Sequence, residues 1–118
     1  MVYVQKITIF TFKKGCLCMV RGTTPTICFR LPIQANTFEW VYITFAKQGG
    51  SIILEKTKND CSLEGCKILC TLTQAETLSF PTNCNIEIQI RAKTAAGNAV
   101  ASNIIVCDVG RILKDGAI

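Results

Sequence analysis

A chain of 118 residues has the usual size of one domain, and its hydrophobic fraction of 49% argues against intrinsic disorder. Thirteen basic and eight acidic residues give a net charge of +5, but only Lys13 and Lys14 are adjacent cations. Such scattered charge is typical of a solubilising surface and argues against a nucleic-acid-binding stripe. No apolar run approaches about 18 residues, so the sequence predicts no contact with a membrane interior.

Residues 1–18 are predicted to form an N-terminal β extension, because residues 2–12 are rich in β-branched and aromatic side chains. The apolar stretch comes before Lys13 and Lys14, whereas a secretory signal begins with its positive charges. We therefore expect the chain to be synthesised in the cytoplasm.

The middle of the chain alternates strand signals with turn signals. The predicted strands cover residues 25–31, 38–47, 52–57, 61–63 and 66–71. Gly49 and Gly50, between the second and third of these strands, predict a hairpin. After the last strand, Thr73 and Glu76 have the spacing of a capping box, which predicts a single helical turn through Leu78.

The stretch from residue 85 to residue 109 carries the clearest pattern in the sequence. Apolar side chains alternate with polar ones, in the order Ile86, Glu87, Ile88, Gln89, Ile90, Arg91, Ala92 and Lys93. This alternation indicates a strand with one buried and one solvated face. Turn residues follow at 95–98 and a second β-rich run at 99–109, so we predict a long hairpin at the centre of a sheet.

These elements predict an all-β fold, an antiparallel β-sandwich of about seven to eight short strands with one short helical turn. The sandwich domain is predicted to cover residues 19–109, and residues 110–118 form a C-terminal tail. Cys28 and Trp40 have the spacing seen in antibody domains, but Cys28 alternates with the inward residues of its own strand. We therefore predict the sandwich without the antibody-type disulfide.

The sequence contains no histidine, which excludes Ser-His-Asp and Cys-His catalysis and any histidine-ligated metal site. The eight cysteines lack the paired Cys-x-x-Cys spacing that favours zinc, and the carboxylates fit solvated strand and turn positions. We therefore expect no catalytic, cofactor-binding or metal-binding residues, and a protein that is not an enzyme. Free thiols are expected in the cytoplasm; in an oxidising compartment, Cys61 and Cys66 are the pair most expected to meet.

Two aromatic residues are the best candidates for binding a small ligand. Alternation along residues 38–47 places Trp40 and Tyr42 on the face opposite Val41 and Ile43. Such a pair is suited to stacking on a sugar. It also fits a second packing face or a contact between subunits.

The tail at residues 110–118 is too short to form a core, yet it carries the apolar residues Ile112, Leu113 and Ile118. It is expected either to close the end of its own sandwich or to dock on a neighbouring subunit. For docking, we expect the apolar residues to be buried and Arg111 to set the register through a carboxylate or a backbone carbonyl.

Several segments between residues 19 and 118 carry a family resemblance. The most specific are GTTPT from residue 22, QIR from residue 89, ASN from residue 101 and GRIL from residue 110. They resemble small structural proteins of tailed phages and prophages of gut Firmicutes. The layout is also similar to the immunoglobulin-like N-terminal domain of phage upper baseplate proteins. The cysteine content and residues 1–18 depart from that pattern.

The resemblance implies an immunoglobulin-like sandwich without catalytic residues or cofactors, in a structural protein of the virion tail, baseplate or head–tail region. Its partners would be other virion structural proteins and further copies of itself, rather than nucleic acid or membrane. It would reach the virion after synthesis in the bacterial host cytoplasm. The alternative function, from a different class, is a carbohydrate-binding β-sandwich module that uses Trp40 and Tyr42.

Overall fold

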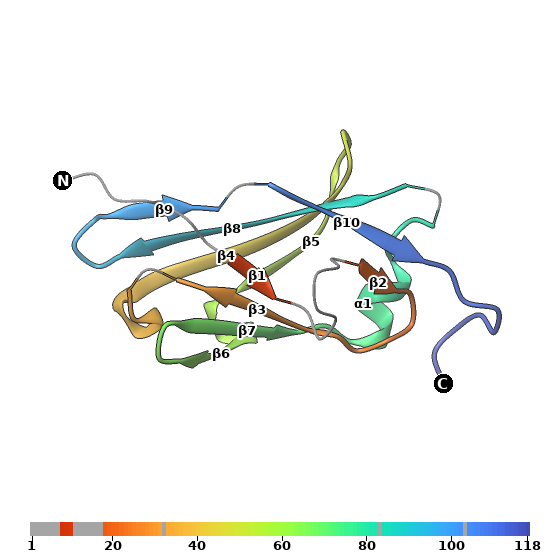
Figure 1. Cartoon of the computed structure of the whole chain (residues 1–118), viewed down its shortest axis with the longest axis horizontal. Coiled ribbons are helices and arrows are strands. Elements are labelled where there is room, and N and C mark those ends of the chain that lie inside the picture. The colour runs from red at the N-terminus through yellow and green to blue at the C-terminus, as the bar shows by residue number, and fades with distance from the viewer. Residues whose placement is uncertain (1–7, 11–17, 32, 83, 103) are drawn as a thin grey trace.

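A computed structural model of the chain describes residues 8–10, 18–31, 33–82, 84–102 and 104–118. These residues form two β-sheets packed face to face (Figure 1). The strands of the first sheet are, in spatial order, β1 (Thr8–Phe10), β3 (Thr26–Arg30), β7 (Lys67–Thr71) and β6 (Cys61–Glu64). Those of the second sheet are β2 (Cys18–Val20), β10 (Ile105–Gly110), β8 (Ile86–Thr94), β4 (Phe38–Lys47) and β5 (Ile52–Thr57), with β9 (Ala99–Ala101) also paired to β8.

Within these described ranges, three short helical segments connect the strands, namely η1 (Ala35–Thr37), η2 (Lys58–Asp60) and α1 (Gln74–Leu78). The predicted capping box of α1 is confirmed, because Glu76 N donates to Thr73 Oγ1 at 3.1 Å and Thr73 N donates to Glu76 Oε1 at 2.8 Å. Across the described part of the chain, no helix has the length and apolar character needed to cross a membrane.

The predicted all-β sandwich is confirmed, and the strands predicted at residues 38–47 and 52–57 have the bounds of β4 and β5. Two details differ from the prediction of about seven to eight antiparallel strands. The described residues contain ten strands. One is added because the predicted arm at 99–109 is divided into β9 and β10. The other is β2, which was not predicted because three residues are too few to show an alternation of apolar and polar side chains. In addition, β2 runs parallel to β10, with Met19 opposite Val109.

The predicted N-terminal extension is described only in part. Residues 1–7 and 11–17 lie outside the described residues, so most of this prediction is not addressed. Within it, β1 pairs antiparallel with β3, and Ile9 lies opposite Phe29.

The strand β8 lies at the centre of the second sheet, as its alternation predicts. Ile88 and Ile90 are fully buried and lie opposite Phe45 and Ile43 of β4. Buried side chains from the other side of the core come from β3 and β7 of the first sheet and from Leu72, which follows β7. They are Ile27, Phe29, Ile68, Cys70 and Leu72. The core therefore consists of the inward faces of two sheets, with β8 and β4 in its middle.

A β-bulge divides the strand that follows the β8 turn. Between the pairs Arg91–Ala101 and Ile88–Ile105, β8 has two residues and the opposing arm has three. Ser102 compensates for the interrupted ladder: its Oγ accepts a hydrogen bond from Ile90 N at 3.1 Å, and its own N donates to Ile90 O at 2.9 Å. The side chain thus supplies an acceptor that a regular ladder would take from the backbone.

The prediction that Cys61 would meet Cys66 in an oxidising compartment is wrong, because a different cysteine lies opposite Cys61. In the hairpin of β6 and β7, Cys61 lies opposite Cys70, whereas Cys66 follows the turn at Gly65. With about 3.4 Å per strand residue, Cys66 is too far along the hairpin to meet Cys61. All three are free thiols, and the hydrogen bond with Cys61 and burial raise the pKa of Cys70.

An ion pair between buried Lys56 and partly exposed Glu76 joins α1 to the edge strand β5. Lys56 is 9% exposed, and its Nζ pairs with the Glu76 carboxylate. Burial disfavours the charge of Lys56, but the hydrogen bond and negative charge of Glu76 outweigh it and raise the pKa of Lys56. Burial acts against the Glu76 charge as well, and the bonds from Lys56 and Thr73 outweigh it and lower the pKa of Glu76.

Ile88→Ala and Ile90→Ala are each expected to lower the free energy of unfolding by about 2–5 kcal/mol, because each removes fully buried methyl groups and leaves a cavity. Gln89→Ala is the matched control on the same strand. Its side chain points outward and donates one hydrogen bond to the Ser102 carbonyl at 2.9 Å, so we expect a loss of about 1 kcal/mol. Urea denaturation measures all three variants, and equal losses would contradict the register of β8.

Glu76→Gln is expected to lower the free energy of unfolding at pH 7 by about 2–3 kcal/mol, because it leaves the buried Lys56 ammonium without a counter-charge. The lowered pKa of Glu76 means that its contribution is present above the ordinary value of 4.5 and is lost as pH falls through the folded value. The raised pKa of Lys56 means that its contribution is complete below 10.5 and is lost at higher pH.

Denaturation curves from pH 2 to pH 7 test this pair. As the pH falls below about 4.5, Glu76→Gln should lose less stability than the parent protein, because it lacks the carboxylate that becomes protonated there. Glu64→Gln, at an exposed carboxylate of β6, is the control. A Glu76→Gln curve parallel to that of the parent would show that the ion pair does not contribute to the acid sensitivity.

Candidate functional site

The candidate site lies on the outer face of the second sheet, which is the face turned away from the core. Trp40 and Tyr42 of β4 are 46% and 42% exposed there. The register of β4 and β8 places Lys93 opposite Trp40 and Arg91 opposite Tyr42. On its other side, Lys93 lies opposite Ala99 of β9. Strand pairing therefore gathers two aromatic rings and two cations on one patch of the sheet.

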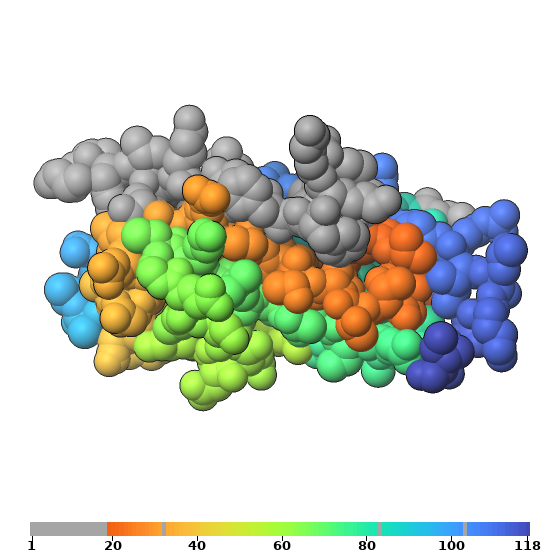
Figure 2. Space-filling view, turned by 60° about the horizontal axis from the view of Figure 1, so that its bottom comes forward, coloured from red at the N-terminus to blue at the C-terminus, as the bar shows by residue number. Residues whose placement is uncertain are grey.

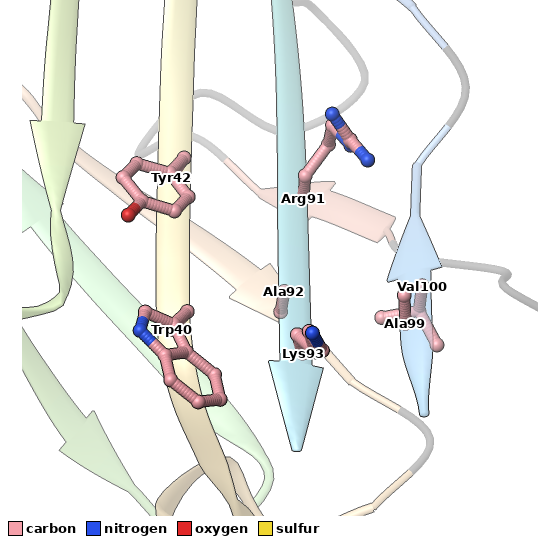
Figure 3. Close-up of a pocket in the computed structure, with 7 residues that line it drawn as sticks. All are labelled: Trp40, Tyr42, Arg91, Ala92, Lys93, Ala99 and Val100. Carbon is pink, nitrogen blue, oxygen red and sulfur yellow. The ribbon is translucent and has the colours of Figure 1, made fainter. Parts of the chain in front are cut away.

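These side chains border a shallow depression of about 260 Å³, which we call the aromatic–cationic depression (Figure 3). Its lining residues are Trp40, Tyr42, Arg91, Ala92, Lys93, Ala99 and Val100. The depression exists because the neighbouring strand β9 presents only methyl groups on this face, with Ala99 beside Lys93 and Ala101 beside Arg91. In Figure 3 both aromatic rings are seen nearly face-on from the solvent side of the sheet.

The depression is positively charged. Lys93 Nζ lies 5.4 Å from the centre of the Trp40 ring, a distance at which the cation is attracted to the π-electrons. In the part of the chain that the structure describes, neither Arg91 nor Lys93 forms an ion pair with a carboxylate, and the lining contains no acidic residue. The site therefore presents two cations with unused hydrogen-bond donors next to two apolar ring faces.

A second hollow, of about 270 Å³, lies on the β5 side of the same two aromatic residues. Besides Trp40 and Tyr42, its lining residues are Glu39, Val41, Thr57, Lys58 and Asn59. Its described lining contains one carboxylate and one cation, whereas the charged residues in the described lining of the aromatic–cationic depression are both cations. Trp40 and Tyr42 thus form a ridge between two open hollows of different charge.

Sequence reasoning identified Trp40 and Tyr42 but not their partners. Arg91 and Lys93 were predicted only as the solvated face of their strand, because alternation assigns a face and not a neighbour. The missing information is the pairing of β4 with β8, which are separated by almost forty residues of chain. A signal was present in the two cations at alternate positions with no acidic residue between or beside them.

The predicted tail residues lie elsewhere, at the end of the sandwich that carries α1 (Figures 1 and 2). Ile112 packs towards Gly22: a methyl group added at Gly22, whose φ is +75°, would lie 3.1 Å from Ile112 Cδ1. Ile118 N donates to Gln74 Oε1 at 3.1 Å. Arg21 also forms an ion pair with Asp115 of the tail, with 3.8 Å between the nitrogen and the carboxylate oxygen. The tail therefore contacts its own sandwich through Ile112, Asp115 and the backbone of Ile118.

Several side chains of the tail point to solvent. Leu113 and Ile118 are 92% and 93% exposed, and Arg111 is exposed as well. The structure therefore divides the predicted set, with Ile112 half-buried and its neighbours available to a partner. It brings none of them near Trp40 and Tyr42, because β9 and the tail lie at opposite ends of the sandwich (Figure 1).

No family model matches this chain, and no curated protein shows significant similarity to it.

Among the described residues, no group of three or more histidine, cysteine, aspartate or glutamate side chains is arranged to hold a metal ion.

Ile112→Ala is expected to lower the thermal midpoint of the protein, because it removes a half-buried side chain that packs towards Gly22. We expect a loss of about 1–2 kcal/mol. Leu113→Ala is the matched control, with a change within about 0.5 kcal/mol, because that side chain is 92% exposed. Light scattering gives the second readout, in which Leu113→Ala reduces any multimers while leaving the midpoint unchanged. Equal midpoints for both variants would show that the tail is not held on its own sandwich.

Proposed function

We propose that this chain is a non-enzymatic structural protein of a phage virion, from the tail, baseplate or head–tail region. It works through protein–protein contacts, with other virion proteins and with further copies of itself. The virion assignment is supported by the resemblance of residues 19–118 to phage structural proteins. The mode of action is supported by the surface of the sandwich.

The observation that carries the proposal is the number of large apolar side chains left in solvent on so small a domain. Among the described residues these are Val20, Ile33, Trp40, Tyr42, Ile52, Ile104, Val106, Leu113 and Ile118. Single exposed apolar residues are common on any protein, whereas groups of them are typical of surfaces that a partner covers.

The exposed side chains do form groups. On the outer face of the second sheet, one cross-strand row runs from Val106 through Glu87 and Ala46 to Ile52. Ile104 lies beside this row, where it lines a small hollow with Ala46 and Glu87. The row thus offers a partly apolar strip across the sheet.

The tail, beyond the end of the sandwich, adds two further exposed apolar side chains, Leu113 and Ile118. Arg111 is exposed beside them and can donate hydrogen bonds to a partner. A multimer of such domains would bury the apolar strip of the second sheet and the exposed tail side chains. Both are small, which is typical of contacts that become stable only when they are repeated in an assembly.

The test is the composition of purified particles. Particles from an induced culture that carries this gene are separated on a density gradient and analysed by mass spectrometry. We expect peptides of this chain to sediment with the major capsid and tail proteins and to remain after a high-salt wash. Peptides found in the lysate but not in the particle band would overturn the virion assignment.

A second candidate function, carbohydrate binding, is favoured by a specific observation. Trp40 and Tyr42 present their ring faces to solvent with an open hollow on either side (Figure 3). Aromatic rings in this position are suited to stacking on the apolar face of a sugar ring, because stacking removes apolar surface of both partners from water.

A further inference from the structure

We infer that the aromatic–cationic depression binds an acidic saccharide, a sugar chain whose rings carry carboxylate groups. The sugar rings stack on Trp40 and Tyr42, and Arg91 and Lys93 hold a carboxylate. This inference rests on the second candidate function, carbohydrate binding, and it does not depend on whether the chain belongs to a virion.

The charge of the site selects an anion. Arg91 and Lys93 project from alternate positions of β8 onto the same face, and the other described residues that line the depression add no carboxylate. A surface cation that is already paired gains little from a ligand, but within the described residues these two cations have no carboxylate partner. An arginine guanidinium matches the two oxygens of a planar carboxylate, and the flexible lysine adds a second charge.

The aromatic rings select a ligand with apolar ring faces. Lys93 Nζ lies 5.4 Å from the centre of the Trp40 ring, so a ring that stacks beside Trp40 or on Tyr42 carries its substituents within reach of a cation. An acidic peptide would satisfy the cations but would present no rings to the aromatic faces. A neutral sugar would satisfy the rings but would leave both cations without a partner.

The shape of the site selects a chain rather than a compact molecule. The hollows on the two sides of the Trp40–Tyr42 ridge are open, with about 260 and 270 Å³, whereas sites for single small molecules are usually enclosed. A saccharide that crosses the ridge therefore occupies both hollows. Its carboxylate lies on the Arg91 side, because the other hollow contains Glu39 as well as Lys58.

The test is direct binding followed through the only tryptophan of the chain, Trp40. The probe is tetragalacturonate, and its matched control is the fully methyl-esterified tetrasaccharide, which keeps the sugar rings and loses the charge. A hexaglutamate peptide is the third ligand. We expect a change in tryptophan fluorescence with tetragalacturonate, binding at least about tenfold weaker with the ester, and weaker binding still with the peptide.

Three single variants locate the site. Arg91→Gln and Lys93→Gln should each weaken tetragalacturonate binding about tenfold, because each removes one charge from the depression and keeps a side chain of similar length. Lys114→Gln removes an equally exposed charge from the tail and should leave binding unchanged. Thermal midpoints are measured in parallel, and none should change, because all three side chains are exposed.

Each contrary outcome has one meaning. Equal affinity for the acid and its ester leaves carbohydrate binding in place and overturns the role of the two cations. Binding of hexaglutamate alone replaces the saccharide with an acidic protein segment. No binding of any ligand overturns both the acidic saccharide and the second candidate function. Equal loss in all three variants would show an effect of overall charge rather than of this site.

Discussion

The structure depends on the register of β8, which pairs with β4 on one side and with β9 and β10 on the other. Its inward residues, such as Ile88 and Ile90, lie in the middle of the core, while Arg91 and Lys93 lie on the outer face. A slip of one residue would bury the two cations and expose the isoleucines, at a cost far above the stability of a small domain. The same packing that stabilises the sandwich therefore fixes the two cations beside the aromatic ridge.

The bulge at Ser102 gives the outer face its two different regions. Because Ser102 replaces a ladder partner of Ile90, the strand opposite β8 is divided into two pieces with different outward residues. β9 presents Ala99 beside Lys93, which leaves room for the depression. β10 presents Val106, which continues into the apolar row that ends at Ile52. A regular strand would bring one continuous row of side chains along the whole of β8 and would not separate a charged hollow from an apolar strip.

The sequence predicts the faces of this fold well and its long-range pairings poorly. Alternation is a local property, so the strand bounds of β4 and β5 and the inward isoleucines of β8 follow from a few neighbouring residues. The parallel pair of β2 and β10, the meeting of Cys61 with Cys70, and the position of Lys93 beside Trp40 all depend on contacts between distant segments. At the site, the sequence therefore identifies the aromatic half and not the cationic half. Capping is again local, which explains why α1 was predicted while the ion pair of its Glu76 was not.

The positions of the two candidate surfaces decide which bound states can coexist. The tail projects Leu113 and Ile118 beyond the α1 end of the sandwich, whereas the depression lies at the β9 end (Figure 1). A partner that covers only the tail leaves Trp40 and its cations open to a saccharide, so assembly and ligand binding are compatible in one molecule. A partner that extends over the aromatic–cationic depression instead must bury Arg91 and Lys93, and burying a cation without a counter-charge is costly. Such a partner therefore needs carboxylates at the same places as the saccharide, so the charge of the depression constrains either kind of ligand.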